Sequence, residues 1–284
     1  MTKFISYSIR AGIVLIIILG FLAFSALWYF SSGLPDYKKL SNYQPPVSSR
    51  VYAENGKLIA EYALEKRLFI PYESIPKKII NSFLSAEDKN FFSHPGVDAK
   101  GIIRAVINNF KNIINDKRLE GASTITQQVA KNFLLTNEVS LRRKIKEAIL
   151  AFRIEKAYSK ERILELYLNQ IYLGEGTYGI AAASLEYFDK SVKEINYPEA
   201  ALLAALPKAP SKYNPFRYGK EAKKRRDLVL NNIKENGFIS NSEFKDFKKS
   251  KIKLKKRKIE LLNEANSYTE EVRRIIKENY GFKK

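Results

Sequence analysis

The sequence has no cysteine and a single histidine, His94, in its 284 residues. The absence of cysteine excludes a disulfide scaffold, a zinc site built on cysteine and thiol catalysis. One histidine excludes a metal centre with several histidine ligands. The Walker A, GxGxxG, HExxH and GxSxG patterns are also missing. Nucleotide-binding proteins, metalloproteases and α/β-hydrolases therefore have no support as classes for this chain.

Acidic residues are few beside the basic ones. There are 30 Asp and Glu against 50 Lys and Arg, which gives a formal net charge of +20. An excess of this size points to an anionic partner, which could be nucleic acid, membrane phospholipid or a phosphorylated substrate. Because 45% of the residues are hydrophobic, the chain can bury a core and is not a disordered polycation.

Residues 11–30 contain no charged side chain. As a helix rising about 1.5 Å per residue, this run would cross a hydrocarbon layer of roughly 30 Å. Lys3 and Arg10 precede it and aromatic residues close it, which predicts a cytoplasmic tail (1–10), one transmembrane anchor (11–30) and an exported remainder. A cleaved signal peptide is the alternative, although its apolar stretch is usually only about 7–15 residues long. Export argues against nucleic acid as the natural partner.

The exported part is expected to begin with a stalk at residues 31–49, which are rich in Ser and Pro. A strand from residue 50 and the turn Asn55-Gly56 predict a β-hairpin. Hydrophobic spacing is helical from about residue 75 to 240, including an amphipathic run at 102–114 with Asp98 as its expected cap. Further helices are expected near residues 122–134, 140–157, 160–171, 177–187, 197–205 and 220–236. The prediction is a mainly α domain with a small β-hairpin over residues 50–244.

Residues 245–258 hold nine Lys or Arg and one Asp. Ile252 and Leu254 alternate with lysines there, which suits a short exposed edge strand. One interpretation is a solvated charged segment, and the other is contact with anionic lipid head groups or a neighbouring domain. We expect residues 245–284 to be a basic linker followed by the truncated start of a further domain.

Glu87 lies in line with an apolar helical stripe formed by Ile80, Phe83 and Leu84. A carboxylate in such a place must be paired, hydrogen-bonded or shifted to a higher pKa, because an unpaired buried charge is costly. A carboxylate tuned in this way suits general acid–base chemistry. A structural ion pair would explain the position equally well.

A second acid, Glu147, follows Arg143 by one helical turn in a segment that is apolar on both sides. Such a helix is normally buried between two layers, so Arg143 and Glu147 are expected to face each other or a ligand. A structural salt bridge is the alternative. Between the two acids, residues 121–132 (GASTITQQVAKN) combine small and amide side chains. These residues suit sugar hydroxyls or phosphate oxygens, or form an ordinary polar helix start.

Five blocks occur in an order that resembles the peptidoglycan glycosyltransferases of glycosyltransferase family 51, the polymerase domain of class A penicillin-binding proteins and monofunctional transglycosylases. The resemblance covers about residues 50–240. Its blocks are residues 87–96 (EDxxFxxHxG in the family), 121–128 (GGSTITQQ), 143–147 (RKxxE), 160–174 (KxxILExYLNxxxxG) and 225–230 (RRxxVL).

The resemblance implies a lysozyme-like helical domain that polymerises lipid II into β-1,4 glycan strands with release of undecaprenyl pyrophosphate. It implies Glu87 as the general base of an inverting reaction and Glu147 on the donor side, where Mg²⁺ or Mn²⁺ could be held. Asp88 and His94 would support the loop that carries Glu87. The substrate-binding residues implied are Ser123, Thr124, Gln127, Gln128, Lys131, Arg143 and Asn169.

The resemblance also implies a location and partners. The enzyme would span the bacterial cytoplasmic (inner) membrane once, with its catalytic domain on the periplasmic or extracellular side. Its partners would be lipid II, the growing glycan strand, membrane phospholipids and proteins of a cell-wall synthesis complex, and not nucleic acid.

Two positions depart from the family pattern. Ala122 stands where the family has its second glycine, and Val139 stands where many members have an arginine that helps to bind pyrophosphate. Arg142, Arg143 or Lys144 would then have to compensate, or activity would be reduced. Two other functions therefore stay open: a lysozyme-like enzyme that cleaves glycan, and a catalytically weakened membrane scaffold.

Overall fold

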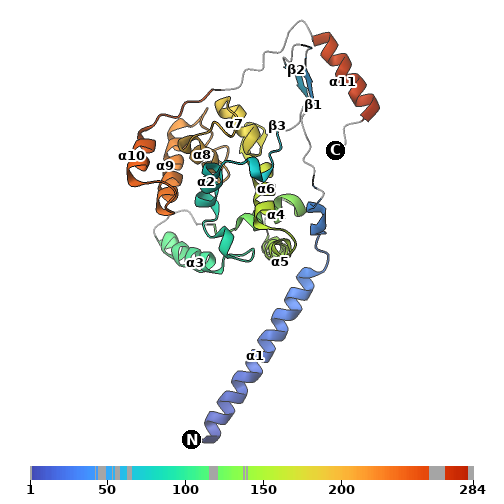
Figure 1. Cartoon of the computed structure of the whole chain (residues 1–284). Coiled ribbons are helices and arrows are strands. Elements are labelled where there is room, and N and C mark those ends of the chain that lie inside the picture. Colours follow the sequence, from blue (N-terminus) through green and yellow to red (C-terminus); the bar gives the residue numbers. More distant parts are fainter. Residues whose placement is uncertain are drawn as a thin grey trace.

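The computed structural model describes residues 2–41, 43, 49–52, 54, 58–62, 66–114, 121–136, 138, 140–255 and 266–280. Its helices are α1 (Thr2–Ser31), α2 (Lys77–Glu87), α3 (Ala99–Ile114), α4 (Ile125–Leu134), α5 (Leu141–Ala157), α6 (Lys160–Gln170), α7 (Ile180–Phe188), α8 (Tyr197–Ala205), α9 (Gly219–Glu235), α10 (Asn241–Lys249) and α11 (Asn266–Tyr280). The prediction of a mainly α protein with a small β element is confirmed (Figure 1).

The strands form two small sheets. Strands β1 (Ser49–Tyr52) and β2 (Leu58–Tyr62) pair antiparallel, as the hairpin prediction requires, although the turn Asn55-Gly56 lies outside the described residues. In the second sheet, β5 (Thr177–Tyr178) lies between β3 (Lys66–Arg67) and β4 (Tyr172–Gly174). The helix expected from residue 177 therefore begins only at Ile180. Gly179 precedes it with φ of 80° and approaches the backbone of Asn169 too closely for a side chain.

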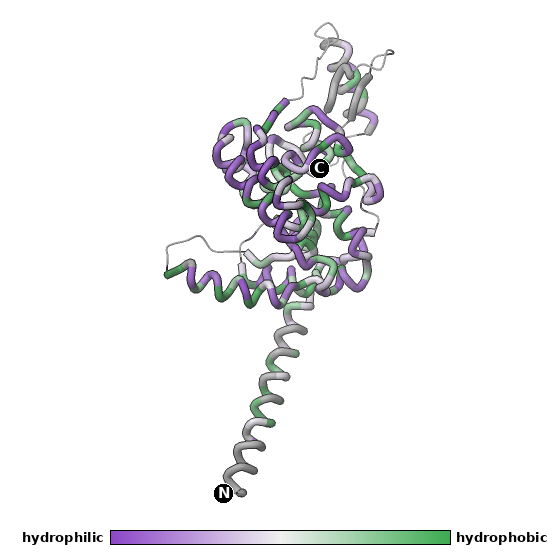
Figure 2. Tube along the Cα trace, turned by 60° about the vertical axis from the view of Figure 1, so that its left-hand side comes forward, coloured by the Kyte–Doolittle hydropathy of each residue, from purple (hydrophilic) through white to green (hydrophobic). Residues whose placement is uncertain are grey.

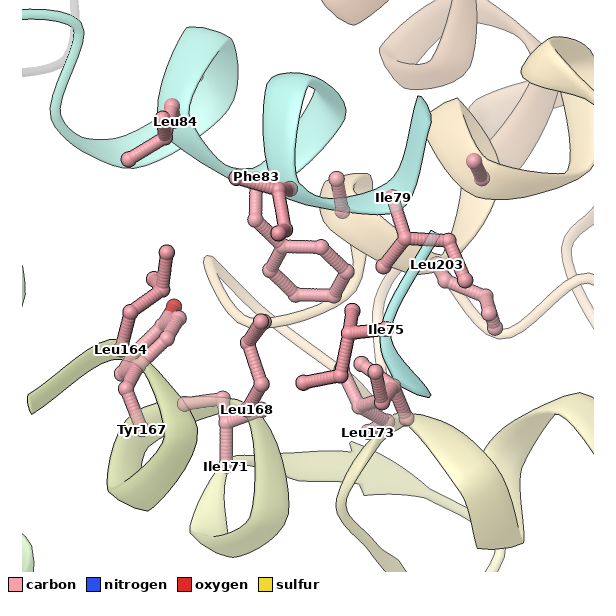
Figure 3. Close-up of a cluster of buried hydrophobic side chains, with 14 of the residues drawn as sticks. Ile75, Ile79, Phe83, Leu84, Leu164, Tyr167, Leu168, Ile171, Leu173 and Leu203 are labelled. Atoms are coloured by element: carbon pink, nitrogen blue, oxygen red, sulfur yellow. The ribbon is translucent and has the colours of Figure 1, made fainter. Parts of the chain in front are cut away.

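The core lies where α2 packs against α6, α8 and α9. Ile79 and Phe83 of α2 are fully buried, and Figure 3 shows Phe83 pointing from α2 toward Leu168 of α6. Burying a side chain of this size contributes about 1.5–3 kcal/mol. This packing fixes the carboxyl end of α2, and with it Glu87, against the rest of the domain.

Helix α1 runs away from the domain (Figure 1). Over the described residues, no helix, α1 included, combines the length and the hydropathy of a membrane-spanning segment. The span at residues 11–30 thus stays a prediction.

Helix α3 has an exposed apolar face. Asp98 Oδ1 accepts a hydrogen bond from Gly101 N at 2.9 Å, so the predicted cap is confirmed. The apolar stripe, however, does not pack on the core, because Ile103, Val106 and Phe110 are each more than 60% exposed. Figure 2 shows α3 crossing the base of the domain, at the end from which α1 departs.

Parts of the predicted stalk and of the basic segment after α10 pack on the domain. Within the predicted stalk, Leu40 is buried in the core, and Tyr158 donates a hydrogen bond from its hydroxyl to the carbonyl of Tyr37. The prediction of an edge strand around Ile252 and Leu254 is wrong. Helix α10 continues to Lys249, and residues 251–255 are irregular, with the two apolar side chains packed on the core.

Candidate active site

Glu87 is the last residue of α2, and its side chain reaches a polar neighbour on α4. Gln128 Nε2 donates a hydrogen bond to Glu87 Oε2 at 2.8 Å. Helix α4 is held in place by a capping box, in which Thr124 and Gln127 exchange side-chain and backbone hydrogen bonds. The start of α4 thereby fixes the position of Gln128 relative to Glu87.

The electrostatic surroundings raise the pKa of Glu87. Burial is the main cause, since it disfavours the charged carboxylate, and the negative charge of Asp88 acts in the same direction. The Gln128 hydrogen bond and the cations of Arg225 and Lys208 act in the opposite direction without cancelling the rise. A carboxylate with a raised pKa is a stronger base, which is what proton abstraction from a hydroxyl requires.

Asp88 and His94 form a buried support beneath Glu87. His94 Nε2 lies 3.0 Å from Asp88 Oδ2, and His94 Nδ1 accepts a hydrogen bond from Gly96 N. Asp88 Oδ2 also accepts from the backbone N–H of Ile125, the first residue of α4. A carboxylate at that place also interacts favourably with the helix dipole. These contacts favour the supporting role predicted for Asp88 and His94, which stays a prediction.

We expect Asp88→Asn to lower the free energy of unfolding by about 2 kcal/mol, because His94 Nε2 faces both carboxylate oxygens and an amide would turn its NH2 group toward that donor. Urea denaturation of the full chain measures this loss. The exposed Asp246→Asn change on α10 is the control and should stay within about 0.5 kcal/mol of the original chain. Equal stabilities for the two variants would contradict the supporting role.

Glu147 is buried among cations. Its Oε2 accepts from Lys144 Nζ at 2.7 Å, and its Oε1 lies 3.2 Å from Arg143 Nε. Arg143 Nε has no hydrogen-bond partner among the described residues, so this second contact is electrostatic only. Lys144 Nζ also donates to Ser123 Oγ at 2.6 Å. Arg143 and Lys144 therefore place charged hydrogen-bond donors where an incoming anion could bind.

Two adjoining cavities bring these groups together. The larger, about 760 Å³, contains Glu87 and Asp88, and the smaller, about 320 Å³, contains Glu147, Arg143 and Lys131. Glu87 lines both. The carboxylate with a raised pKa therefore sits at the junction between a roomy cavity and a cationic one.

The structure adds two cations that the sequence argument did not assign to the site. Lys208 and Arg225 line both cavities beside Glu87. Arg225 belongs to the fifth sequence block, so a signal existed, but nothing in the sequence around Lys208 pointed to the site. Arg225 Nε is buried without a hydrogen-bond partner in the described part of the chain.

Six of the seven predicted substrate-binding residues border the two cavities, and Asn169 does not. Ser123, Gln128, Lys131 and Arg143 line the smaller cavity. Thr124 and Gln127 also border the cavities, but their side chains are buried and bonded within the capping box. The prediction that Asn169 binds substrate is corrected, because Asn169 lines neither cavity. Its side-chain amide forms hydrogen bonds with the backbone N–H and carbonyl of Ile70 and with the carbonyl of Glu165. Val139 lies outside the described residues.

The side chains around Glu147 do not fit a divalent cation. Both oxygens of Glu147 face cations already, whereas Mg²⁺ requires several oxygen ligands in a near-octahedral shell. Among the described residues, no three His, Asp or Glu side chains gather into a group that could hold a metal.

Comparison with known proteins gives consistent results. The transglycosylase family model matches residues 55–234. Penicillin-binding protein 1A of Rickettsia felis is 50% identical over 276 residues, covering 97% of this chain and 35% of that protein. Penicillin-binding protein 1A of Aquifex aeolicus is 46% identical over 245 residues, covering 86% of this chain and 33% of that protein. The crystal structure of penicillin-binding protein 1A from Haemophilus influenzae aligns over 84% of this chain and 25% of that one, at 26% identity and a TM-score of 0.49.

The chain spans about a third of the length of these curated relatives. The family match covers more than half of the chain and includes every residue of the two cavities apart from Glu235 and Asn236. The chain therefore belongs to the transglycosylase family and carries a glycosyltransferase family 51 domain of the class A penicillin-binding protein type.

Proposed function

We propose that this chain is a membrane-anchored peptidoglycan glycosyltransferase that polymerises lipid II into β-1,4 glycan strands and releases undecaprenyl pyrophosphate. The observation that carries the proposal is the contrast between two glutamates in adjoining cavities. Glu87 has an amide as its hydrogen-bond donor and a raised pKa, whereas Glu147 is held between Arg143 and Lys144. The surroundings of Glu87 suit a general base. The cations around Glu147 suit the stabilisation of a leaving anion.

Glu87 is the proposed general base. Its Oε2 is occupied by Gln128, while Oε1 has no hydrogen-bond donor among the described residues. Oε1 takes the proton of the acceptor 4-hydroxyl as that oxygen attacks the anomeric carbon of the donor. The bond from that carbon to the pyrophosphate breaks on the opposite face, which gives inversion.

Lys131, Arg143 and Lys144 of the smaller cavity stabilise the leaving pyrophosphate. Negative charge grows on it as its bond to the sugar breaks, and nearby cations bind it more strongly in the transition state than before. Glu147 keeps Arg143 and Lys144 in place and is a positioning residue in this scheme. Ser123 is held by Lys144 at the same edge of the cavity.

We also propose that the domain stands on the outer face of the cytoplasmic membrane, with residues 1–10 inside, 11–30 as anchor, 31–49 as a short connection and 50–244 as the glycosyltransferase domain. The uncharged run at 11–30 supports the anchor. The exposed apolar face of α3 lies at the same end of the domain and suits contact with phospholipid. Residues 245–284 would form a basic linker, and cell-wall synthesis proteins would be partners.

The test is to incubate the full chain in detergent or proteoliposomes with lipid II and, separately, with finished glycan. Polymer from lipid II supports the proposal. Fragments from finished glycan without any polymer would instead identify a lysozyme-like hydrolase. No reaction with either, in a folded protein that stays in the membrane after carbonate extraction, would favour the scaffold.

A further inference from the structure

The first two turns of α5 carry an unusual concentration of positive charge. Arg142, Arg143, Lys144 and Lys146 lie there, and the first turn has no acidic residue. The amino end of a helix already has a partial positive charge, so cations at that end are unfavourable unless an anion is close by. Glu147 neutralises only part of this charge.

These cations line two different cavities. Arg143 and Lys144 contact Glu147. Arg142 and Lys146 have no carboxylate within 4 Å in the described part of the chain, and both line a separate cavity of about 290 Å³. Arg143 lines this cavity and the smaller catalytic cavity alike. One helix start therefore presents cations to two cavities.

The separate cavity combines cations with apolar side chains. Besides the cations, it is lined by the apolar side chains of Leu134 and Leu135, and its one carboxylate, Glu138, is exposed. Three cations against one acid leave a net positive charge, which favours an anionic head group over a zwitterionic one.

The position of the cavity supports the same ligand. Residues 33 and 35, just after α1, line it, and the guanidinium of Arg142 lies 5.9 Å from the ring centre of Tyr29 in α1. Phe21, Leu22 and Phe24 on α1 are exposed. If α1 is the anchor, the cavity lies at the level of lipid head groups, with apolar helix surface next to it for acyl chains.

We propose that this cavity binds the head group of an anionic phospholipid, with its phosphate between Arg142 and Lys146. The inference rests on the membrane location proposed above. A bound phosphate would reduce the repulsion at the start of α5 and so hold Arg143, which the two cavities share, in its place beside Glu147. The membrane lipid would then support the catalytic cavity from the other side of the same helix.

The experiment uses the only tryptophan of the chain, Trp28, which is exposed on α1 next to Tyr29. The full chain in neutral detergent is titrated with short-chain phosphatidylglycerol and, separately, with short-chain phosphatidylcholine, and Trp28 fluorescence is recorded. We expect a saturable change with phosphatidylglycerol only. Arg142→Gln combined with Lys146→Gln should weaken it at least tenfold.

The matched control replaces two exposed lysines of α10, Lys245 and Lys249, with glutamine, and should change the affinity less than twofold. Equal weakening by both pairs, or an unchanged affinity in the Arg142/Lys146 pair, would overturn the proposal. So would a response to a prenyl phosphate but not to phosphatidylglycerol. The titration needs neither polymerisation nor a bilayer, so a failure of the proposed function, measured in parallel with lipid II, is recognised separately.

Discussion

Glu87→Gln is expected to reduce glycan polymerisation by about 10²–10⁴-fold, the usual contribution of a general base. The change keeps the shape of the side chain and an oxygen that can accept the Gln128 hydrogen bond, but the amide cannot take a proton from the acceptor hydroxyl. Polymer formed from labelled lipid II, separated by length, measures the loss. The control is Glu235→Gln, which replaces another glutamate lining the larger cavity and should leave the rate within a factor of about two.

The raised pKa of Glu87 adds a pH signature. Because the base must be ionised, kcat/KM falls on the acid side of its pKa, and burial places that fall above the ordinary value of 4.5. The folded state holds this proton more tightly than the unfolded chain, so the free energy of unfolding decreases as the pH rises through the folded pKa. Glu87→Gln removes this dependence, and the variant should be more stable than the original chain at neutral pH. A variant that loses activity and stability together would contradict the assignment.

Local patterns in the sequence predicted most of the helices and the position of both glutamates. The stripe through Ile80, Phe83 and Leu84 placed Glu87 in line with the buried face of α2, where the structure leaves it partly exposed. The spacing of Arg143 and Glu147 predicted their contact. These predictions needed only helical periodicity, which is a property of neighbouring residues.

Contacts between distant segments could not be predicted in this way. Lys208 lies beside Glu87 only because the loop after α8 returns to the end of α2, and no local pattern encodes that return. Asn169 belongs to a sequence block typical of the family, but the block contributes to packing here, and its amide holds the backbone at Ile70. The apolar spacing at 102–114 predicted an amphipathic helix, but not what its apolar face contacts, and the structure leaves that face exposed at the base of the domain.

Glu147→Gln is the second change with a large expected effect, a loss of about 10²-fold in polymerisation. A neutral amide no longer balances Arg143 and Lys144, so the cations repel each other and leave the positions from which they would meet the leaving pyrophosphate. The free energy of unfolding should fall by about 2 kcal/mol, since Lys144 then donates to a neutral amide oxygen and the amide NH2 group faces Arg143. The rate is measured at saturating lipid II, and stability by urea denaturation.

Glu155→Gln separates a structural from a functional effect. Glu155 lies on the same helix, has a side chain 8% exposed against 3% for Glu147, and pairs with Lys160 while accepting from Thr126. It lines neither catalytic cavity. Both variants should lose similar stability, but only Glu147→Gln should lose most of the polymerising activity, because only its cations face the substrate. If the two variants lost activity in proportion to their stability, Glu147 would be a structural salt-bridge residue, and the cationic cavity would have to bind pyrophosphate without it.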